Sequence, residues 1–188
     1  DDELAYKHAL GEDQSRYLNI YTNDASGYLG YAYFPQDYAG SVYDGVVMKH
    51  SVVGGRNLPG AAPYDQGRTL AHEIGHYLGL YHTFQGTGGQ CENTFTSGDV
   101  IVDTPPHDSP DYGTEASFVC DGNTAIENFM NYSDDVAMDR FTEQQSNRMV
   151  CGLLNYRADT ITSSSQTTFT ATGDSSPLTV TGLSSGAT

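Results

Sequence analysis

The first third of the chain has the apolar and polar spacing that is typical of β-strands. Three stretches carry this alternation or a short continuous apolar run: residues 16–23 (RYLNIYTN), 29–35 (LGYAYFP) and 45–54 (GVVMKHSVVG). Gly27 and Gly30 mark a turn between the first two stretches, and residues 54–63, which contain glycine and proline, form a loop after the third. The pattern therefore predicts a sheet and then a loop that leads into the next element.

Two later segments have the spacing of helices. The first is expected to begin near residues 65–69 and to end at Gly79, where a residue without a Cβ adopts positive φ. The second covers residues 142–157, and Thr142 and Gln145 form a capping-box pair at its start. Four apolar residues share one stripe of this second helix and are expected to pack inside the domain: Met149, Val150, Leu153 and Leu154.

The first of these helices carries the sequence HEIGHYLGLYH, residues 72–82, which has the spacing of a zinc site. His72 and His76 are four residues apart, so their imidazoles project from one face of the helix and reach a common ion. Beyond Gly79 the chain turns back, and His82 arrives from outside the helix. The three histidines would fill three of the four tetrahedral positions of zinc.

Glu73 lies beside these ligands and is expected to act on a water molecule in the fourth position. Its carboxylate would take a proton as the water attacks the scissile carbonyl, and would then pass that proton to the leaving amine. A lone histidine is more often a packing or solvent-facing residue. However, five residues at these fixed offsets seldom arise by chance, so the motif favours a zinc hydrolase and, above all, a metallopeptidase.

The motif resembles that of the metzincin metallopeptidases, whose signature HExxHxxGxxH is followed by a methionine in a tight turn beneath the metal. Within this group, the chain is similar to the pappalysin (ulilysin-like) family over residues 16–157. Segments besides residues 29–35 carry this likeness: 44–47 (DGVV), 82–84 (HTF), 103–106 (DTPP) and 127–135 (ENFMNYSDD). The resemblance implies an α+β fold of the metzincin type, with a twisted mixed sheet over an active-site helix. The Met-turn and the C-terminal helix would lie in an irregular lower subdomain.

The resemblance also implies roles for residues near the zinc motif. Met130 would form the Met-turn, and Tyr132 would lie near the metal, where its O–H donates to the oxygen of the carbonyl under attack. Taken alone, a methionine or a tyrosine is more often a packing residue, so both roles depend on the family likeness. Residues 29–35 would be the edge strand that pairs with an extended substrate. The last helix would pack under the Met-turn.

Substrate preference is less well defined by the sequence. Relatives of this family often favour a basic residue just after the cut bond, through an acidic residue shortly after the Met-turn tyrosine. That position falls near Val136, which is uncharged, although Asp135 and Asp139 are alternative acidic groups for the same pocket. A wall formed by Val136 would instead favour apolar residues. The sequence leaves both possibilities open.

Cysteine placement indicates one disulfide bond. Cys91 and Cys120 bracket a stretch rich in glycine and aspartate, and we expect them to pair. Cys151 falls inside the last helix and is expected to be a buried free thiol. A second bridge that relatives commonly carry is not expected, because Ala137 stands at its position. A disulfide requires an oxidising compartment, which favours secretion.

Residues 86–123 are rich in Gly, Asp, Asn, Ser and Pro, so they are expected to be mostly irregular. A segment of this kind needs an additional staple. The resemblance favours calcium in that role, with hard oxygen ligands from Asp99, Asp103 and Thr104. The alternative is an ordinary solvated acidic loop.

Length and composition set the remaining limits. The chain has 188 residues, which fits one catalytic domain at residues 1–159, and more than half of residues 160–188 are Ser or Thr. This tail is either a linker or the start of an appended β-module. The formal net charge of −16 disfavours nucleic acid and anionic membranes as partners, and no apolar run is long enough for a transmembrane helix. The expected partner is a protein or peptide substrate, and the expected state is a secreted monomer.

Two other functions stay open at this point. One is a zinc amide hydrolase that acts on a non-protein substrate, and the other is a catalytically inactive binding module. The presence of Glu73 argues against the inactive module, because a vestigial site has no reason to keep the base alongside all three ligands.

Overall fold

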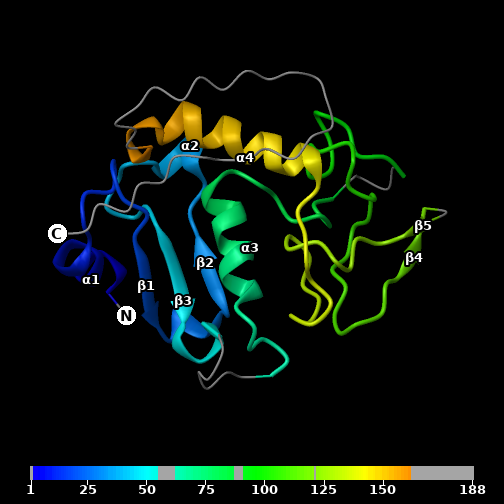
Figure 1. The fold of residues 1–188 in the computed structure, drawn as a ribbon, viewed down its shortest axis with the longest axis horizontal. Coiled ribbons are helices and arrows are strands. Elements are labelled where there is room, and N and C mark those ends of the chain that lie inside the picture. Colours follow the sequence, from blue (N-terminus) through cyan, green and yellow to red (C-terminus); the bar gives the residue numbers. More distant parts are fainter. Residues whose placement is uncertain (1, 55–61, 87–90, 121, 162–188) are drawn as a thin grey trace.

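The structure, a computed structural model, describes residues 2–54, 62–86, 91–120 and 122–161, and its main sheet has three strands (Figure 1). They are β1 (Ile20–Asn23), β2 (Gly30–Ala32) and β3 (Val46–Lys49), in the spatial order β1-β3-β2. β3 is parallel to β1 and antiparallel to β2. The predicted mixed sheet is therefore confirmed.

The third strand lies between the first two, so the turn that Gly27 and Gly30 mark does not join neighbouring strands. Val46, Val47 and Met48 are completely buried, and such a continuous apolar run is typical of a strand that is covered on both faces. β1 and β2 are less buried and take the outer positions. Each strand is also shorter than predicted: Gly30 lies within β2, and the third stretch leaves the sheet after Lys49 as the 3₁₀ turn η2 (His50–Val52). A further 3₁₀ turn, η1 (Ala25–Gly27), precedes β2.

Helix α3 (Arg68–Tyr77) lies beside the sheet and packs against β2 and β3 (Figure 1). It begins and ends within the predicted range, and Gly79 follows it with a φ of 98°. The main apolar core lies between this helix and the sheet, and its buried members are Val46, Met48, Val52 and Tyr77. The zinc motif is thus placed on a helix whose other face is fixed by the core.

Two more helices, α1 (Glu3–Leu10) and α2 (Pro35–Tyr38), are not indicated by the apolar pattern. The buried residue of α1 is Lys7, whose Nζ lies 2.6 Å from the carbonyl oxygen of Tyr43 and 2.8 Å from Glu3 Oε1. Three tyrosine rings surround this ammonium group: those of Tyr21, Tyr31 and Tyr33. Because a charged side chain anchors α1 through cation–π contacts, hydrophobic periodicity does not reveal it.

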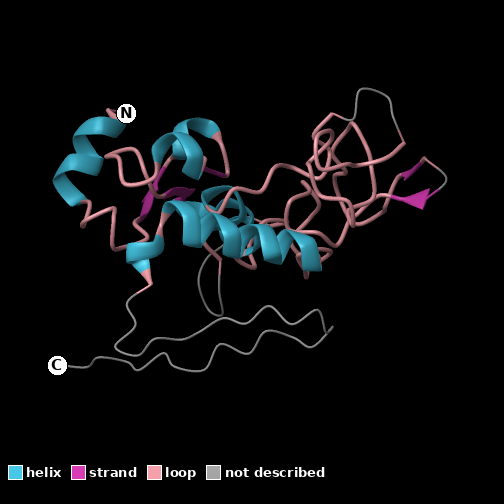
Figure 2. Cartoon of the chain, turned by 90° about the horizontal axis from the view of Figure 1, so that it is seen from above, coloured by secondary structure: helices cyan, strands magenta, loops and turns pink. Residues whose placement is uncertain are grey.

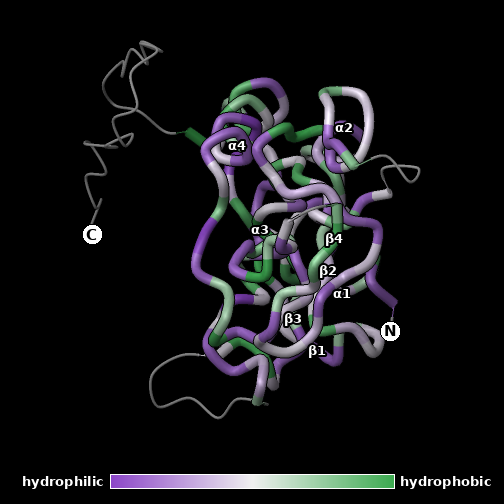
Figure 3. The backbone as a smooth tube through the Cα atoms, turned by 90° about the vertical axis from the view of Figure 1, so that its right-hand side faces the viewer, coloured by the Kyte–Doolittle hydropathy of each residue, from purple (hydrophilic) through white to green (hydrophobic). Residues whose placement is uncertain are grey.

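The chain between α3 and the last helix is almost free of regular structure, as the sequence predicts. Its described part contains the short strands β4 (Phe118–Val119) and β5 (Gly122–Asn123), which pair at the far end of the loop-rich half (Figure 2). The predicted disulfide between Cys91 and Cys120 is present, with Cα atoms 5.2 Å apart. Figure 3 faces this end of the molecule and shows β4 in green, as a hydrophobic strand. Within the described ranges, no helix is long and apolar enough to cross a membrane.

The last long helix, α4 (Glu143–Tyr156), begins with the predicted capping box between Thr142 and Gln145. It passes across the C-terminal end of α3 (Figure 1). The 3₁₀ turn η3 (Ala158–Thr160) follows it. The predicted tail lies outside the described residues from position 162 onward.

The contact between α4 and the end of α3 is close and polar, which corrects the predicted apolar stripe. The four stripe residues are exposed or only half-buried: Met149, Val150, Leu153 and Leu154. The buried positions are Gln145 and Gly152, and Arg148 Nε donates a hydrogen bond of 2.7 Å to the carbonyl oxygen of Gly79. Because a helix end presents unpaired carbonyl groups, donors and small residues suit this position better than leucine. Cys151 is a free thiol, but it is exposed rather than buried.

Arg157, directly after α4, is buried against the sheet side of the domain. Its guanidinium forms an ion pair with the buried carboxylate of Asp44 and lies 3.7 Å from the centroid of the Tyr77 ring. This contact ties the end of α4 to the segment that enters β3 and to the last residue of α3.

We predict that Gly152→Ala lowers the free energy of unfolding by about 1–3 kcal/mol, the usual cost of overpacking a tight contact. A Cβ at this position would lie 2.2 Å from the carbonyl oxygen of Leu78, so α4 would have to move away from α3. Urea denaturation measures the effect. Cys151→Ala is the matched control on the exposed side of the same turn, where a change below about 0.5 kcal/mol is expected. Equal stability of the two variants would contradict the close contact.

Candidate metal centre and active-site cleft

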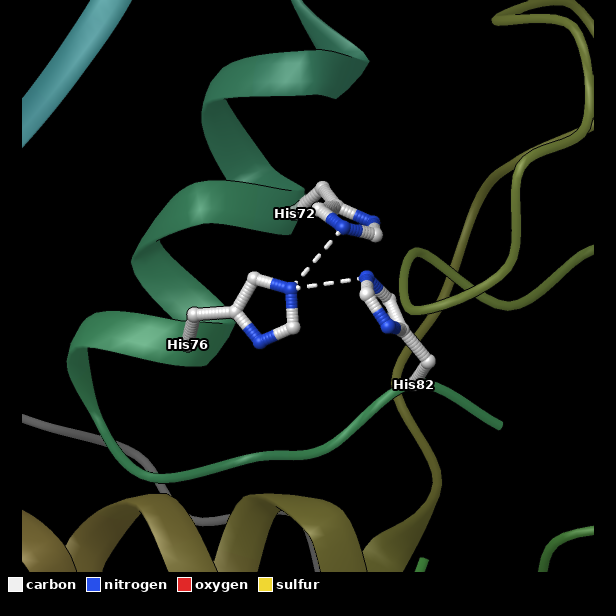
Figure 4. A group of neighbouring side chains, drawn as sticks. All are labelled: His72, His76 and His82. Carbon is white, nitrogen blue, oxygen red and sulfur yellow. Dashed lines mark hydrogen bonds between the residues drawn. The ribbon is translucent and has the colours of Figure 1, made fainter. Parts of the chain in front are cut away.

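Three histidine side chains converge at the C-terminal half of α3 (Figure 4). His72 and His76 project from the helix, and His82 comes from the loop after it. The Nε2 atom of His76 lies 3.1 Å from that of His72 and 3.0 Å from that of His82. Among the described residues, these three form the group of His, Cys, Asp or Glu side chains that can hold one metal ion.

The hydrogen bonds on the other ring nitrogens decide which tautomers are present. His72 Nδ1 lies 2.6 Å from the carbonyl oxygen of Phe129, and His76 Nδ1 lies 2.8 Å from that of Leu80. A carbonyl oxygen only accepts hydrogen bonds, so each Nδ1 carries the proton and each Nε2 presents a lone pair. Carbonyl partners of this kind orient histidine ligands in metal sites.

Burial keeps the three rings uncharged. It lowers the pKa of His72 well below its usual value, with further contributions from His76 and His82. Burial also lowers the pKa of His76, and burial followed by the proximity of His76 lowers that of His82 to about 3. Two Nε2 lone pairs at 3.1 Å repel each other unless a cation lies between them. Zinc with tetrahedral nitrogen ligands would separate neighbouring nitrogens by about 3.3 Å, so the donor set fits this ion.

The predicted base, Glu73, lies on α3 next to His72 and is 5% exposed. β2 passes very close to it, since a Cβ added to Gly30 would lie 2.8 Å from Glu73 Cγ. Burial raises the pKa of the carboxyl group to about 8. The edge strand and the helix thus hold this carboxyl group in a mostly apolar setting beside the three imidazoles.

The Met-turn segment supports the histidines from below. Met130 is completely buried, and its chain reverses through a hydrogen bond of 3.0 Å from the N–H of Asn131 to the carbonyl oxygen of Asn128. The same turn supplies the Phe129 carbonyl that orients His72. Asn128 and Gln145 exchange two side-chain hydrogen bonds, which join the turn to α4.

Gly75 also takes part in the contact between the Met-turn and α3, and the sequence analysis did not identify it. A Cβ on Gly75 would lie 2.3 Å from Met130 Sδ, so the sulfur packs directly against the backbone of α3 between the two helical histidines. A glycine in the middle of a helix is unfavourable by itself. The glycine inside the helical sequence HEIGH was therefore the feature from which this contact could have been predicted.

Tyr132 is brought to the same place as the histidines. Its ring centroid lies 5.7 Å from that of His72, 4.9 Å from that of His82 and 4.7 Å from that of Phe84. Its side chain is 37% exposed, and burial of the phenol raises its pKa. Its hydroxyl is therefore protonated at neutral pH and available as a donor.

These groups line a cavity of about 710 Å³. One wall is formed by residues 27–32 and Phe34, which include β2, and the opposite wall by residues 131–133 of the Met-turn segment. α3 contributes Thr69 and the zinc-motif residues to the floor. In the order β1-β3-β2, the strand predicted to meet the substrate is at an edge of the described sheet.

The residues predicted to form the specificity pocket do not line this cavity. Asp135 is completely buried, and its Oδ2 accepts hydrogen bonds from the backbone N–H groups of Gln66 and Arg68, at the start of α3. Val136 is 68% exposed. Asp139 is exposed and pairs with Arg140 at 2.7 Å. Asp135 thus caps a helix, the other two are exposed, and the predicted pocket stays a prediction.

The predicted calcium ligands are divided between two places. Asp99 is buried and accepts hydrogen bonds from Thr104 Oγ1 at 2.7 Å and from the N–H of Ile101 at 3.0 Å. Asp103 instead accepts hydrogen bonds from Thr142 Oγ1 and the N–H of Gln144, at the start of α4. Asp99 and Thr104 are thus in contact, and Asp103 caps a helix.

Comparison with known proteins adds sequence relatives. The family model Peptidase_M43, described as pregnancy-associated plasma protein-A, matches residues 4–154. An extracellular metalloprotease of Colletotrichum graminicola is 42% identical over 164 residues, which cover 83% of this chain and 56% of that protein. Extracellular metalloprotease 1 of Coccidioides posadasii is 41% identical over 166 residues, 84% of this chain and 56% of that protein. The chain thus spans about half the length of the curated relatives it matches.

Solved structures give the same picture. Mirolysin in complex with compound 9 matches with a TM-score of 0.70 and 31% identity, over 84% of this chain and 62% of that chain. Mature mirolysin of Tannerella forsythia in complex with a cleaved peptide matches with a TM-score of 0.66 and 30% identity, over 85% of this chain and 62% of that chain. The expected metzincin fold is confirmed.

We predict that Gly75→Ala destabilises the protein by about 1–3 kcal/mol, although alanine normally stabilises a helix interior relative to glycine by about 1 kcal/mol. The sign reverses because the added methyl group overlaps Met130 Sδ. Urea unfolding and a zinc titration measure stability and metal affinity, which should fall together. In the double variant with Met130→Ala, the two costs should not add in full. Full additivity would show that this contact is not the cause.

Proposed function

Since the chain belongs to peptidase family M43, the family of pregnancy-associated plasma protein-A, we propose that it is a zinc-dependent endopeptidase that hydrolyses peptide bonds. One observation carries this proposal: three neutral imidazole nitrogens face a common point beside a buried carboxyl group. His72, His76 and His82 would hold the zinc ion.

In this function, each residue of the cleft has a distinct task. When bound, zinc supplies a Lewis acid that polarises the scissile carbonyl and acidifies a water molecule. Glu73 accepts a proton on its carboxylate and then donates it to the nitrogen of the departing amine. Tyr132 donates its O–H to the carbonyl oxygen as negative charge develops there. Met130 supports the histidines and takes no part in proton transfer.

The substrate is proposed to bind in an extended conformation along β2. The outer edge of this strand offers backbone donors and acceptors beside Glu73, so a peptide would add as a further strand. The mirolysin relative was solved with a cleaved peptide, which favours a peptide over a non-protein amide. The retention of Glu73 favours a working hydrolase over an inactive binding module.

The setting of the activity follows from other features. We propose that the protein is secreted, because the matched relatives are named extracellular and the Cys91–Cys120 bridge requires an oxidising compartment. The net charge of −16 favours peptides over nucleic acids and anionic membranes as partners. We further propose a monomer with its catalytic domain at residues 1–159 and a tail at residues 160–188.

Calcium at Asp99 and Thr104 is also proposed, without Asp103. Burial raises the pKa of Asp99 to about 6, so its negative charge is less favourable than on an exposed carboxylate, and a bound cation would stabilise that charge. Its carboxylate, Thr104 and nearby backbone carbonyls are hard oxygen ligands of the kind that calcium prefers. Asp103 is left out because both of its carboxylate oxygens accept hydrogen bonds at the start of α4.

We predict that calcium raises the melting temperature of the zinc-loaded protein, with a gain of about 2.7 kcal/mol when calcium reaches 100 times its dissociation constant. Asp99→Asn should abolish this response. Asp103→Asn is the matched control, and it should lower stability through the lost cap of α4 but keep the calcium response. Thermal unfolding with and without calcium measures all three proteins. A wild-type protein that does not respond to calcium would refute the site.

For the catalytic proposal, we predict that Glu73→Ala keeps its fold and one zinc ion per chain but loses about 10²–10⁴-fold in kcat, the range for a general base. The assay is cleavage of casein or gelatin, with metal content measured on the same samples. A zinc chelator should stop the wild-type reaction, and added zinc should restore it. Equal activity of the Glu73 variant would overturn the base assignment.

A further inference from the structure

The active-site cleft is nearly free of charge, although the chain has 24 acidic residues. Among the described residues that line it, Glu73 is the only carboxylate, and no lysine or arginine lines it. The acidity of the chain is therefore placed elsewhere.

Three acidic residues follow Tyr132 in the sequence, and none of them lines the cavity. Asp135 caps α3, and Asp139 pairs with Arg140 on the surface. Asp134 is near Tyr64, whose pKa is raised by burial and then by this carboxylate, but Asp134 does not line the cavity. A basic side chain in the cleft would thus meet a single carboxylate within the walls, that of Glu73, which the reaction needs as a base.

The walls are instead aromatic and apolar. Rings come from both sides of the cleft and from the segments before and after α3: Tyr28, Tyr31, Phe34, Tyr64, Tyr81, Tyr112 and Tyr132. Tyr28 and Tyr112 are 67% and 66% exposed, so they stand at the mouth of the cleft. Met138 is 4% exposed and Thr69 is 6% exposed, so both belong to its buried lining.

Thr69 occupies a particular position in this lining. It precedes His72 by three residues and Glu73 by four on α3, so it shares their face of the helix. A substrate side chain that lies beside the cut bond and along this face would meet Thr69. Burying a cation against such a wall without a counter-ion is strongly unfavourable, whereas an aromatic ring gains contact with the neighbouring rings.

We propose that this cleft selects peptides with an uncharged aromatic or large aliphatic side chain beside the cut bond, and that Thr69 and Met138 help to set this selection. The inference rests on the proposed peptidase function and specifies its substrate class. The proposed selection differs from that of the pocket predicted at Asp135, Val136 and Asp139, because none of these residues lines the cavity.

The test compares cleavage profiles of the zinc-loaded protein on a peptide library that contains all residue types. Phenylalanine, tyrosine, leucine or methionine should be enriched beside the cut bond, and lysine and arginine should be depleted. Thr69→Asp adds a carboxylate to the lining, and it should raise the ratio of kcat/KM for an arginine peptide over the matched phenylalanine peptide by about 10-fold or more. Thr69→Asn introduces a side chain of nearly the same shape as aspartate but without its charge, and it should leave this ratio unchanged.

Val136→Asp is the second control, because it adds the same charge at a surface position and should not change the profile. Enrichment of lysine or arginine by the wild-type protein would overturn the inference, and this readout does not depend on whether the variants fold. A switch to arginine in Val136→Asp but not in Thr69→Asp would also overturn it. Absence of cleavage of every peptide by the zinc-loaded protein would instead refute the proposed peptidase function, and the inference with it.

Discussion

The site depends on the mutual approach of three imidazole nitrogens. His76 Nε2 lies 3.1 and 3.0 Å from its two counterparts, and backbone carbonyls hold the protons of His72 and His76 on the far side of each ring. This arrangement directs the lone pairs of His72 and His76 toward one point in a buried setting. A bound cation would hold these nitrogens together, and the surrounding structure must be stiff enough to keep the rings in place.

That stiffness comes from contacts that have little apolar character. Met130 lies against the backbone of α3 at Gly75, Asn128 and Gln145 join the Met-turn to α4, and Asp135 caps the start of α3. Each contact fixes one end or one side of the metal-binding helix. The irregular lower half thus works as a frame for the site, although it has almost no regular secondary structure.

The sequence predicts the parts of this structure that local spacing determines. The bounds of α3, the capping box at Thr142, the disulfide and the convergence of His72, His76 and His82 all follow from residues close in the chain or from a specific motif. The parts that it does not predict depend on distant contacts. Helix α1 is anchored by Lys7, so no apolar pattern marks it.

The same limit applies to the packing of α4 and to the predicted specificity pocket. The stripe that includes Leu154 is correctly periodic, but α4 meets the carbonyl end of α3, where Gly152 and Arg148 fit better. Likewise, Asp135 and Val136 follow Tyr132 within four residues but do not line the cleft. A short distance along the chain does not fix which way a loop residue faces.

The buried pair of Arg157 and Asp44 has a consequence for how the domain is made. Asp44 precedes the central strand, but its counter-ion comes from the other end of the catalytic region. A buried carboxylate without its counter-ion is unfavourable, so this pair joins the folding of the sheet to the last turn of α4. A polypeptide that ends before residue 157 would contain every metal-binding and proton-transferring residue and would still lack the ion pair that joins the two ends of the catalytic region.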